Sequence, residues 1–159
     1  MRAALIDYDD TVEVDLATDS EGSAYKAIRD AVGGLIEPFG ALYGDEVTLY
    51  VNDDGIASGQ RPNRAIYANS RMERARYLSQ FERASFRAGD DGCVRKGDLY
   101  AILFGPIVAV GFDPETGRDR DLDDDELAMV LADFGECAPM GPYSGPEAAL
   151  LVALASRLR

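Results

Sequence analysis

The sequence VTLYVNDDGIASGQRPNRAIY, residues 47–67, decides the fold, because it combines a strand, a turn and a group of polar side chains. Its first five residues are aliphatic, aromatic or β-branched, and they stop at the turn-forming run Asn52-Asp53-Asp54-Gly55. This order is typical of a strand that enters a tight turn. We expect a short return strand at residues 56–59. Pro62 then fixes its own φ angle, and Asn63 is suited to cap the helix that we expect next.

The residues before this stretch predict a β-hairpin and one short helix. Two apolar runs flank Asp9-Asp10, and the second alternates apolar with polar side chains, as a half-buried strand does. The runs are Arg2–Asp7 and Thr11–Leu16. Apolar residues then recur at helical spacing over Ala24–Val32, and Gly33-Gly34 ends the helix. Residues 35–39 predict extended chain, with Pro38 suited to a sheet edge.

The residues after it predict a long helix. The run Ser70-Arg71-Met72-Glu73 has the spacing of a capping box, and no glycine or proline interrupts the chain until Gly89. We therefore expect about five helical turns. The helix carries arginines on several faces: Arg71, Arg74, Arg76, Arg83 and Arg87.

The most apolar segments follow. Asp98–Phe104 and Ile107–Phe112, joined by Gly105-Pro106, predict two buried strands. We expect an acidic, turn-rich loop over residues 113–121. Residues 123–134 predict a helix, because apolar residues recur at i, i+3, i+4 and i+7 and acids occupy the first turn.

Residues 137–159 predict a connector and a terminal helix. Prolines and glycines break up residues 137–145, and the run Ser144-Gly145-Pro146-Glu147 starts a helix that reaches about Leu158. This helix is apolar on nearly all sides, so we expect the rest of the chain or a second copy to cover it. A homo-oligomer would use four leucines: Leu150, Leu151, Leu154 and Leu158.

These segments predict an α+β fold, with a mixed or antiparallel sheet of about five to six strands packed by three to four helices. Residues 1–136 would form a single domain with the arginine-rich helix inserted at residues 69–96. Residues 137–159 would add the connector and the last helix. A length of 159 residues and a hydrophobic content of 47% suit one core.

Composition excludes several classes of site and partner. The net charge of −13 repels nucleic acid and anionic membranes. Histidine is absent, and Cys93 and Cys137 lack metal-ligand spacing, so we expect reduced thiols, no metal and no cofactor. The sequence shows no signal peptide and no apolar run of about 20 residues, so we expect a cytoplasmic protein that does not span a membrane.

Charge is distributed unevenly along the chain. Residues 61–96 hold nine of the sixteen basic residues against four acids, a balance of +5, which leaves −18 for the rest. In one hypothesis the arginines pair with acids of this chain or of a second copy. In the other, the predicted helix at 70–87 binds nucleic acid through Arg71, Arg74, Arg76, Arg83 and Arg87. We favour pairing, because the surrounding negative field repels nucleic acid.

Two acidic motifs resemble catalytic or metal sites. Asp7 and Asp9 follow an apolar run as in haloacid-dehalogenase-type phosphatases, where the first aspartate attacks phosphorus and the second acts as acid and base. That magnesium-dependent chemistry also needs a basic residue deep in the sheet and a later acidic pair on a βα scaffold, which this pattern lacks. We interpret both residues as turn aspartates. Residues 113–124 resemble a calcium loop, but the glycine is one place early and the twelfth residue is not glutamate.

Polar residues of the opening stretch are the remaining site candidates. In one interpretation Asn63 caps a helix and Arg64 pairs with a carboxylate such as Glu37. In the other, four side chains surround a small anion or a partner's carboxylate, which a guanidinium binds well. These four are Asn52, Arg61, Asn63 and Arg64.

Three motifs, in order, resemble those of a known family. They are residues 32–37 (VGGLIE), residues 49–55 (LYVNDDG) with Gly59 and Asn63-Arg64-Ala65, and residues 105–111 (GPIVAVG) with the acidic helix start after them. Over about residues 1–134 the chain is similar to the family described as domain of unknown function 3846. The resemblance implies an accessory gene of a mobile element in bacteria, phages or plasmids, and it implies no activity. Residues 69–96 and the C-terminal segment depart from the family pattern.

We therefore expect a non-enzymatic, acidic accessory protein of a mobile element that binds another protein. A nucleic-acid-handling or defence enzyme of the host is such a partner, because the carboxylates could occupy its basic groove. The first alternative is nucleic-acid binding through the arginine-rich helix. The second is a magnesium-dependent phosphatase that uses Asp7 and Asp9.

Overall fold

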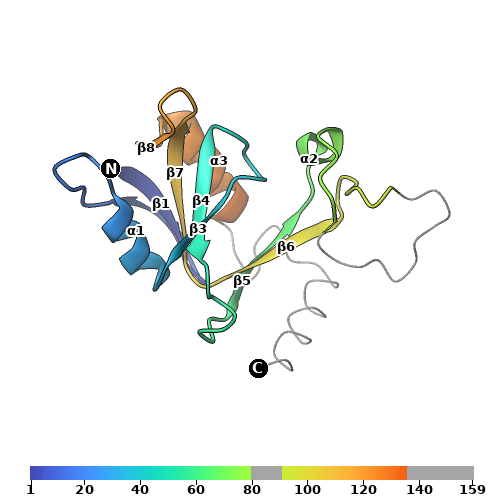
Figure 1. The fold of residues 1–159 in the computed structure, drawn as a ribbon, viewed down its shortest axis with the longest axis horizontal. Coiled ribbons are helices and arrows are strands. Elements are labelled where there is room, and N and C mark those ends of the chain that lie inside the picture. The colour runs from blue at the N-terminus through green and yellow to red at the C-terminus, as the bar shows by residue number, and fades with distance from the viewer. Residues whose placement is uncertain (80–90, 136–159) are drawn as a thin grey trace.

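The computed structural model describes residues 1–79 and 91–135, which form eight strands and three helices (Figure 1). The strands are β1 (Arg2–Ile6), β2 (Thr11–Asp15), β3 (Ile36–Phe39), β4 (Val47–Asn52), β5 (Pro62–Tyr67), β6 (Leu99–Phe104), β7 (Ile107–Asp113) and β8 (Arg118–Arg120). The helices are α1 (Tyr25–Val32), α2 (Ser70–Arg74) and α3 (Asp124–Phe134).

Six strands form the main sheet, with β7 at its centre. The strand order is β2-β1-β7-β4-β3, and β8 pairs with the part of β7 that β1 does not cover. Every pair in this sheet is antiparallel. The predicted α+β fold is confirmed, in its antiparallel form.

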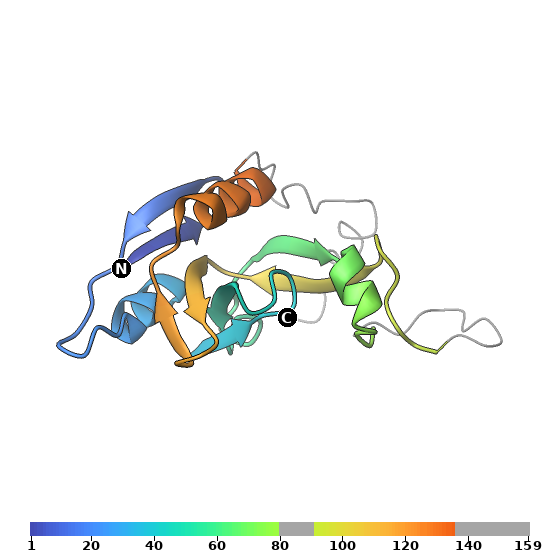
Figure 2. The same ribbon diagram turned by 90° about the horizontal axis from the view of Figure 1, so that it is seen from above.

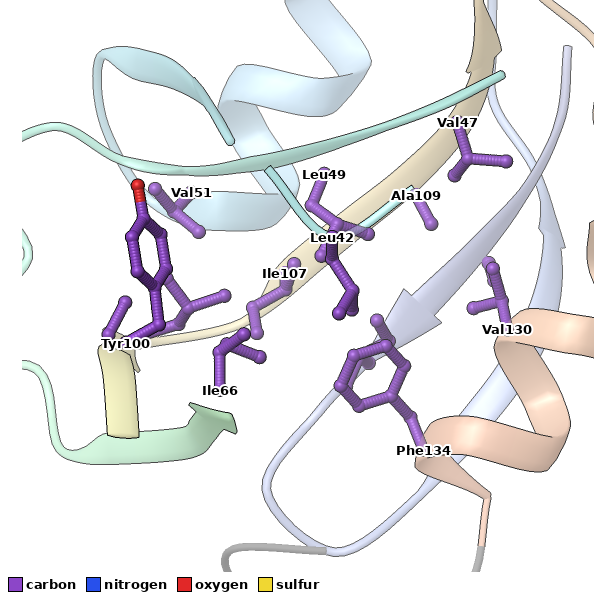
Figure 3. Packing of buried hydrophobic residues seen from close by; sticks show 14 of the residues in the cluster. Leu42, Val47, Leu49, Val51, Ile66, Tyr100, Ile107, Ala109, Val130 and Phe134 are labelled. Carbon is purple, nitrogen blue, oxygen red and sulfur yellow. The ribbon is translucent and has the colours of Figure 1, made fainter. Parts of the chain in front are cut away.

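Side chains along β7 point alternately to the two faces of the main sheet. Both faces are covered by other elements. Val108 packs with Ile28 of α1 on one face. Ile107 packs on the other face in a cluster that includes Phe134 of α3 (Figure 3). Phe134 is fully buried, and burying a side chain of this size stabilises the fold by about 1.5–3 kcal/mol.

Strands β5 and β6 pair with each other and form a separate two-stranded ribbon. Figures 1 and 2 show this ribbon leaving the main sheet, with α2 at its far end. Its inner side chains extend the core of the main sheet: Ile66 and Tyr100 belong to the same cluster as Leu42 and Val51 (Figure 3). The chain therefore changes sheets at Gly105-Pro106, between two strands that the sequence shows only as neighbours.

Several predicted elements are confirmed. The hairpin around Asp9-Asp10 is β1–β2, and the helix that stops at Gly33 is α1. Helix α3 starts with a capping box, in which Asp123 and Glu126 each bond to the other's backbone N–H. Acids fill its first turn, where the helix dipole favours them.

The long helix predicted after Asn69 is wrong in its described part, because α2 ends after five residues. Asn69 is its N-cap, and its side chain accepts from two backbone N–H groups. Arg76 then adopts a left-handed backbone with φ +58°, the position that often ends a helix. Leu78 continues as extended chain and bridges to Cys93.

Three further predictions are corrected. Residues 56–59 form turns rather than a return strand. Asn63 lies inside β5 and does not cap a helix. The acidic loop at 113–121 contains the short strand β8.

Some predictions fall outside the described residues. They concern Arg83, Arg87, Cys137 and the connector and terminal helix with Leu150, Leu151, Leu154 and Leu158. Across the part that is described, no helix combines the length and apolarity needed to span a bilayer.

Candidate functional site

A buried polar cluster lies where the ribbon joins the main sheet. The β5–β6 register shifts between Pro62 and Arg64, so Asn63 is an extra residue in a β-bulge. Bulges redirect side chains, and Asn63 and Arg64 are both fully buried. Asn63 Nδ2 donates to the carbonyl oxygens of Ile6 (2.9 Å) and Gly105 (2.8 Å). It thereby ties β1 to the turn between β6 and β7.

Arg64 bonds to backbone carbonyls rather than to the predicted partner Glu37. Its Nη1 donates to the carbonyl oxygen of Asn63 (3.0 Å) and to Asn63 Oδ1. Its Nη2 donates to the carbonyl oxygens of Asp7 (3.2 Å) and Phe134 (3.4 Å). Glu37 is exposed on the edge strand β3, so it is not the carboxylate partner of Arg64, and pairing with another carboxylate stays a prediction.

Asn52 has a comparable role at the end of α1. Its Nδ2 donates to the carbonyl oxygen of Gly33 (3.1 Å), and its Oδ1 accepts from the N–H of Asp54 (2.9 Å). Gln60 Nε2 also reaches the end of α1, at the carbonyl oxygen of Val32 (2.8 Å). These bonds hold the β4–β5 loop against the helix.

Arg61 is the exposed member of the four predicted ligand residues. Its guanidinium carbon lies 4.3 Å from the ring centroid of Tyr8, a cation–π contact with the turn of the β1–β2 hairpin. Asn52, Asn63 and Arg64 expose 6% or less of their surface, so Arg61 alone of the four offers its side chain to solvent. The anion-binding hypothesis for these residues stays a prediction.

The three sequence motifs that suggested a family meet in this cluster, since Asn52 contacts Gly33 and Asn63 contacts Gly105. The model of the family described as domain of unknown function (DUF3846) matches residues 1–135. The chain belongs to this family. The DUF3846 match covers every described element from β1 to α3. No curated protein and no solved structure matches the chain.

At the ribbon end of the DUF3846 domain, three of the predicted nucleic-acid-binding arginines are exposed: Arg71, Arg74 and Arg76. Arg76 Nη2 lies 2.9 Å from Asp91 Oδ2. The pKa of Asp91 is lowered, first by the N–H of Cys93 and then by nearby arginines. Among the described residues, no carboxylate lies within 4.0 Å of a nitrogen of Arg71 or Arg74. Of these three arginines, Arg76 therefore has the predicted ion pair with an acid of this chain, and the other two have none among the described residues.

The main-sheet part of the DUF3846 domain is strongly acidic. Residues 1–60 and 113–135 hold 22 acids against five basic residues, a balance of −17. Arg2 bridges two of these acids, with Nε 2.7 Å from Glu13 Oε1 and Nη1 2.6 Å from Asp124 Oδ1. Hydrogen bonds to both raise the pKa of Arg2.

Two carboxylates beside β8 have opposite pKa shifts. Glu126 accepts a bidentate pair from Arg120 at 2.8 and 2.7 Å, and these bonds lower its pKa. Asp119 is half buried and accepts from the hydroxyl of Tyr50 (3.0 Å). Burial raises the pKa of Asp119, and burial with the nearby carboxylate raises that of Tyr50. Both carboxylates have structural partners.

The two motifs that resemble phosphatase and calcium sites form turns. Asp7 and Asp9 are exposed in the turn of an antiparallel hairpin rather than at the end of a parallel strand. Asp113 accepts from the Thr116 hydroxyl (2.8 Å) and the Glu115 N–H (2.9 Å), and these bonds lower its pKa. Within residues 1–79 and 91–135, no three potential metal ligands lie together.

A polar hollow of about 320 Å³ has no counterpart in the sequence analysis. It lies between the loop before α1 and the β7–β8 turn, with Met1, Glu21, Arg118 and Asp119 among its lining residues. These residues are up to 118 positions apart, and no motif links them. Only the paired strands bring them together.

Proposed function

We propose that this protein is a non-enzymatic accessory protein of a mobile element that binds a basic protein partner. A nucleic-acid-handling or defence enzyme of the host fits this role, because its nucleic-acid groove carries the complementary charge. The observation that supports the proposal is the separation of charge. The main sheet and its helices, residues 1–60 and 113–135, carry a net charge of −17. The described residues of 61–112 hold seven basic residues against three acids, a net charge of +4.

The polar side chains near the sheet junction and in the hairpin turn also favour binding over catalysis. Asn63 and Arg64 bond to backbone groups where the two sheets join, and Asn52 bonds to the end of α1. The aspartates around the hairpin turn are exposed and offer charge to a partner. Oriented surface charge of this kind accelerates encounter with a basic surface and selects against acidic partners.

The proposal is tested by affinity capture from a bacterial lysate on the immobilised full chain. We expect the wild type to recover a basic protein at low ionic strength and to release it at high ionic strength, since salt screens surface charge. The control is the variant Asp9→Asn/Asp53→Asn/Asp125→Asn. It removes three exposed carboxylates that form no hydrogen bond or ion pair among the described residues. Recovery of no partner, or equal recovery by the variant, would contradict the proposal.

Nucleic-acid binding by the ribbon end is the second candidate function, favoured by the exposure of Arg71 and Arg74 without a described carboxylate partner. Fluorescence anisotropy with labelled single-stranded and duplex DNA at low salt tests it. We expect affinity to fall with salt and to fall further in Arg71→Ala/Arg74→Ala. Unmeasurable binding to both probes would remove this candidate.

A further inference from the structure

Among the described strands, β2 forms an edge of the main sheet, and its register shows which backbone groups face outward. The N–H of Asp7 donates to the carbonyl of Asp10, and the N–H of Leu16 donates to the carbonyl of Met1, both at 2.8 Å. Hydrogen-bonded and non-bonded pairs alternate along an antiparallel ladder. Even-numbered residues of β2 therefore bond to β1, and odd-numbered ones point their N–H and C=O groups away from the sheet. The outward residues are Thr11, Glu13 and Asp15.

Of the three outward N–H groups of β2, one has a partner among the described residues and two do not. The N–H of Thr11 donates to Asp10 Oδ1 (2.8 Å). In the part of the chain that is described, no group bonds to the N–H of Glu13 or of Asp15. The opposite edge of the sheet differs, because Pro38 in β3 has no N–H to offer.

The side chains of β2 give this edge a chemical preference. Thr11 donates to the carbonyl oxygen of Phe134, and Glu13 pairs with Arg2, which also reaches the start of α3. Asp15 pairs with the amino group of Met1, whose nitrogen lies 2.9 Å from Asp15 Oδ1. Glu13 and Asp15 still expose 51% and 91% of their side chains, and with Asp124 they outnumber these two cations, so the α3 side of the edge is acidic. On the α1 side, Val14 packs against the core and Val12 keeps 41% of its surface exposed.

We propose that β2 binds an extended segment of the protein partner as a seventh strand, in which lysine or arginine alternates with valine or isoleucine. The basic residues lie over Glu13 and Asp15, and the apolar residues lie over Val12 and Val14. Backbone hydrogen bonds supply affinity, and the alternating side chains supply specificity. This inference rests on the proposed function, and it names the surface and the partner's chemistry.

A second copy of this chain is a poor occupant of the same edge. In the three central registers of two β2 strands related by a twofold axis, Glu13 lies opposite Glu13, Asp15 or Thr11, so two of the three registers oppose like charges. Like charges directly opposite each other destabilise a strand pair. Opposite charge on the incoming strand removes this penalty.

The test is fluorescence anisotropy at low salt with the full chain and a labelled seven-residue peptide that alternates lysine with valine. Two control peptides keep its composition. One places all lysines before all valines, and the other has N-methylated backbone amides. We expect the alternating peptide to bind about tenfold more tightly than either control. N-methylation removes one or two backbone hydrogen bonds, which account for that ratio, and the block sequence places lysines over Val12 and Val14.

Two variants of one residue separate backbone pairing from charge. Glu13→Gln removes the carboxylate and keeps the N–H, whereas Glu13→Pro removes both. The N–H of residue 13 faces outward, so proline there leaves the β1 ladder intact. We expect Glu13→Pro to weaken binding about tenfold beyond Glu13→Gln. Glu37→Gln on the opposite edge is the matched control and leaves binding unchanged.

Equal binding of all three peptides would overturn the β2 inference and leave a charge-driven protein partner standing. So would the absence of peptide binding when lysate capture by the wild type succeeds. Dimerisation of the wild type that Glu13→Pro abolishes would identify a second copy as the occupant and overturn the inference. The N-methylated peptide keeps the test valid if Glu13→Pro fails to fold.

Discussion

The junction between the two sheets and the far end of the β5–β6 ribbon use similar side chains in opposite ways. At the junction, Asn63 and Arg64 are fully buried and bond to carbonyl groups of β1, the hairpin turn and the end of α3. At the ribbon end, Arg71 and Arg74 are exposed. The comparison shows that the basic, polar segment 61–76 stabilises the fold through buried hydrogen bonds at residues 63 and 64, and faces solvent at residues 71 and 74.

The largest expected effect is at Asn63. Asn63→Ala removes the donor to Ile6 and Gly105 and the side-chain acceptor of a buried guanidinium. We expect the free energy of unfolding to fall by roughly 3 kcal/mol, because buried polar groups lose their partners. Urea denaturation measures this change. If Asn63→Ala/Arg64→Met is no more stable than Asn63→Ala, the buried guanidinium is not the source of the loss.

Gly105→Ala should cause the next largest loss of stability. Gly105 has φ +74°, and a Cβ there would collide with the side chain of Gln60. Gly117 is the matched control, because it has φ +68° and open space around it. Left-handed backbone costs a residue with a side chain about 1–2 kcal/mol, so we expect Gly117→Ala to lose that amount and Gly105→Ala to lose more. Equal thermal midpoints for the two variants would show that the junction tolerates a side chain.

Glu126→Gln tests a partly buried charge pair outside the junction. The pKa of Glu126 is lowered from 4.5 in the fold, so its stabilising effect is present above about pH 4.5 and is lost as the pH falls further. We expect the variant to lose about 1–2 kcal/mol at neutral pH, and its midpoint to approach that of the wild type in acid. A constant difference between the two proteins from pH 7 to pH 3 would contradict the role assigned to the Arg120 pair.

Asp119→Asn should change the stability of the fold in the opposite direction to Glu126→Gln, and by a smaller amount. The pKa of Asp119 is raised above 3.8, so its ionised form disfavours the fold at neutral pH, and the wild type gains stability as the pH falls toward 3.8. The amide oxygen of the variant still accepts from Tyr50. We expect an equal or slightly higher thermal midpoint at pH 7 and loss of that gain in acid. A clearly lower midpoint at pH 7 would show that the charge itself is needed.

The smallest expected effect is at the ribbon end. Arg71→Ala and Arg74→Ala remove exposed side chains with no described carboxylate partner, so we expect both thermal midpoints to match the wild type. A marked loss in either variant would break the contrast between the two regions. Differential scanning fluorimetry of the two variants beside Asn63→Ala gives the direct comparison.

The parts of the fold that could be predicted from the sequence depend on local patterns. The hairpin, α1 and α3 have apolar periodicity and a clear start or stop within their own residues. Helix α2 does not follow its local pattern, because packing decides where it ends. Tyr77 turns inward against Tyr100, with ring centroids 5.9 Å apart, and the left-handed residue before it is arginine rather than glycine.

The junction could not be predicted because its signals are tertiary. Nothing in the sequence marks Asn63 as a bulge, since the extra residue is defined by the partner strand β6. Nor does the sequence show that β6 and β7 join different sheets. The sequence predicts a binding site at the polar residues 52, 61, 63 and 64, whereas the structure gives three of them backbone partners within the fold.

The position of β7 affects how the chain is made. This strand pairs with both β1 and β4, and residue 6 lies opposite residue 107. Strand β1 therefore leaves the ribosome about a hundred residues before β7, the neighbour that it shares with β4, and β4 leaves about 60 residues before it. Contacts so distant in sequence slow folding, so in the nascent chain the edges of β1 and β4 that face β7 stay unpaired until β7 has emerged.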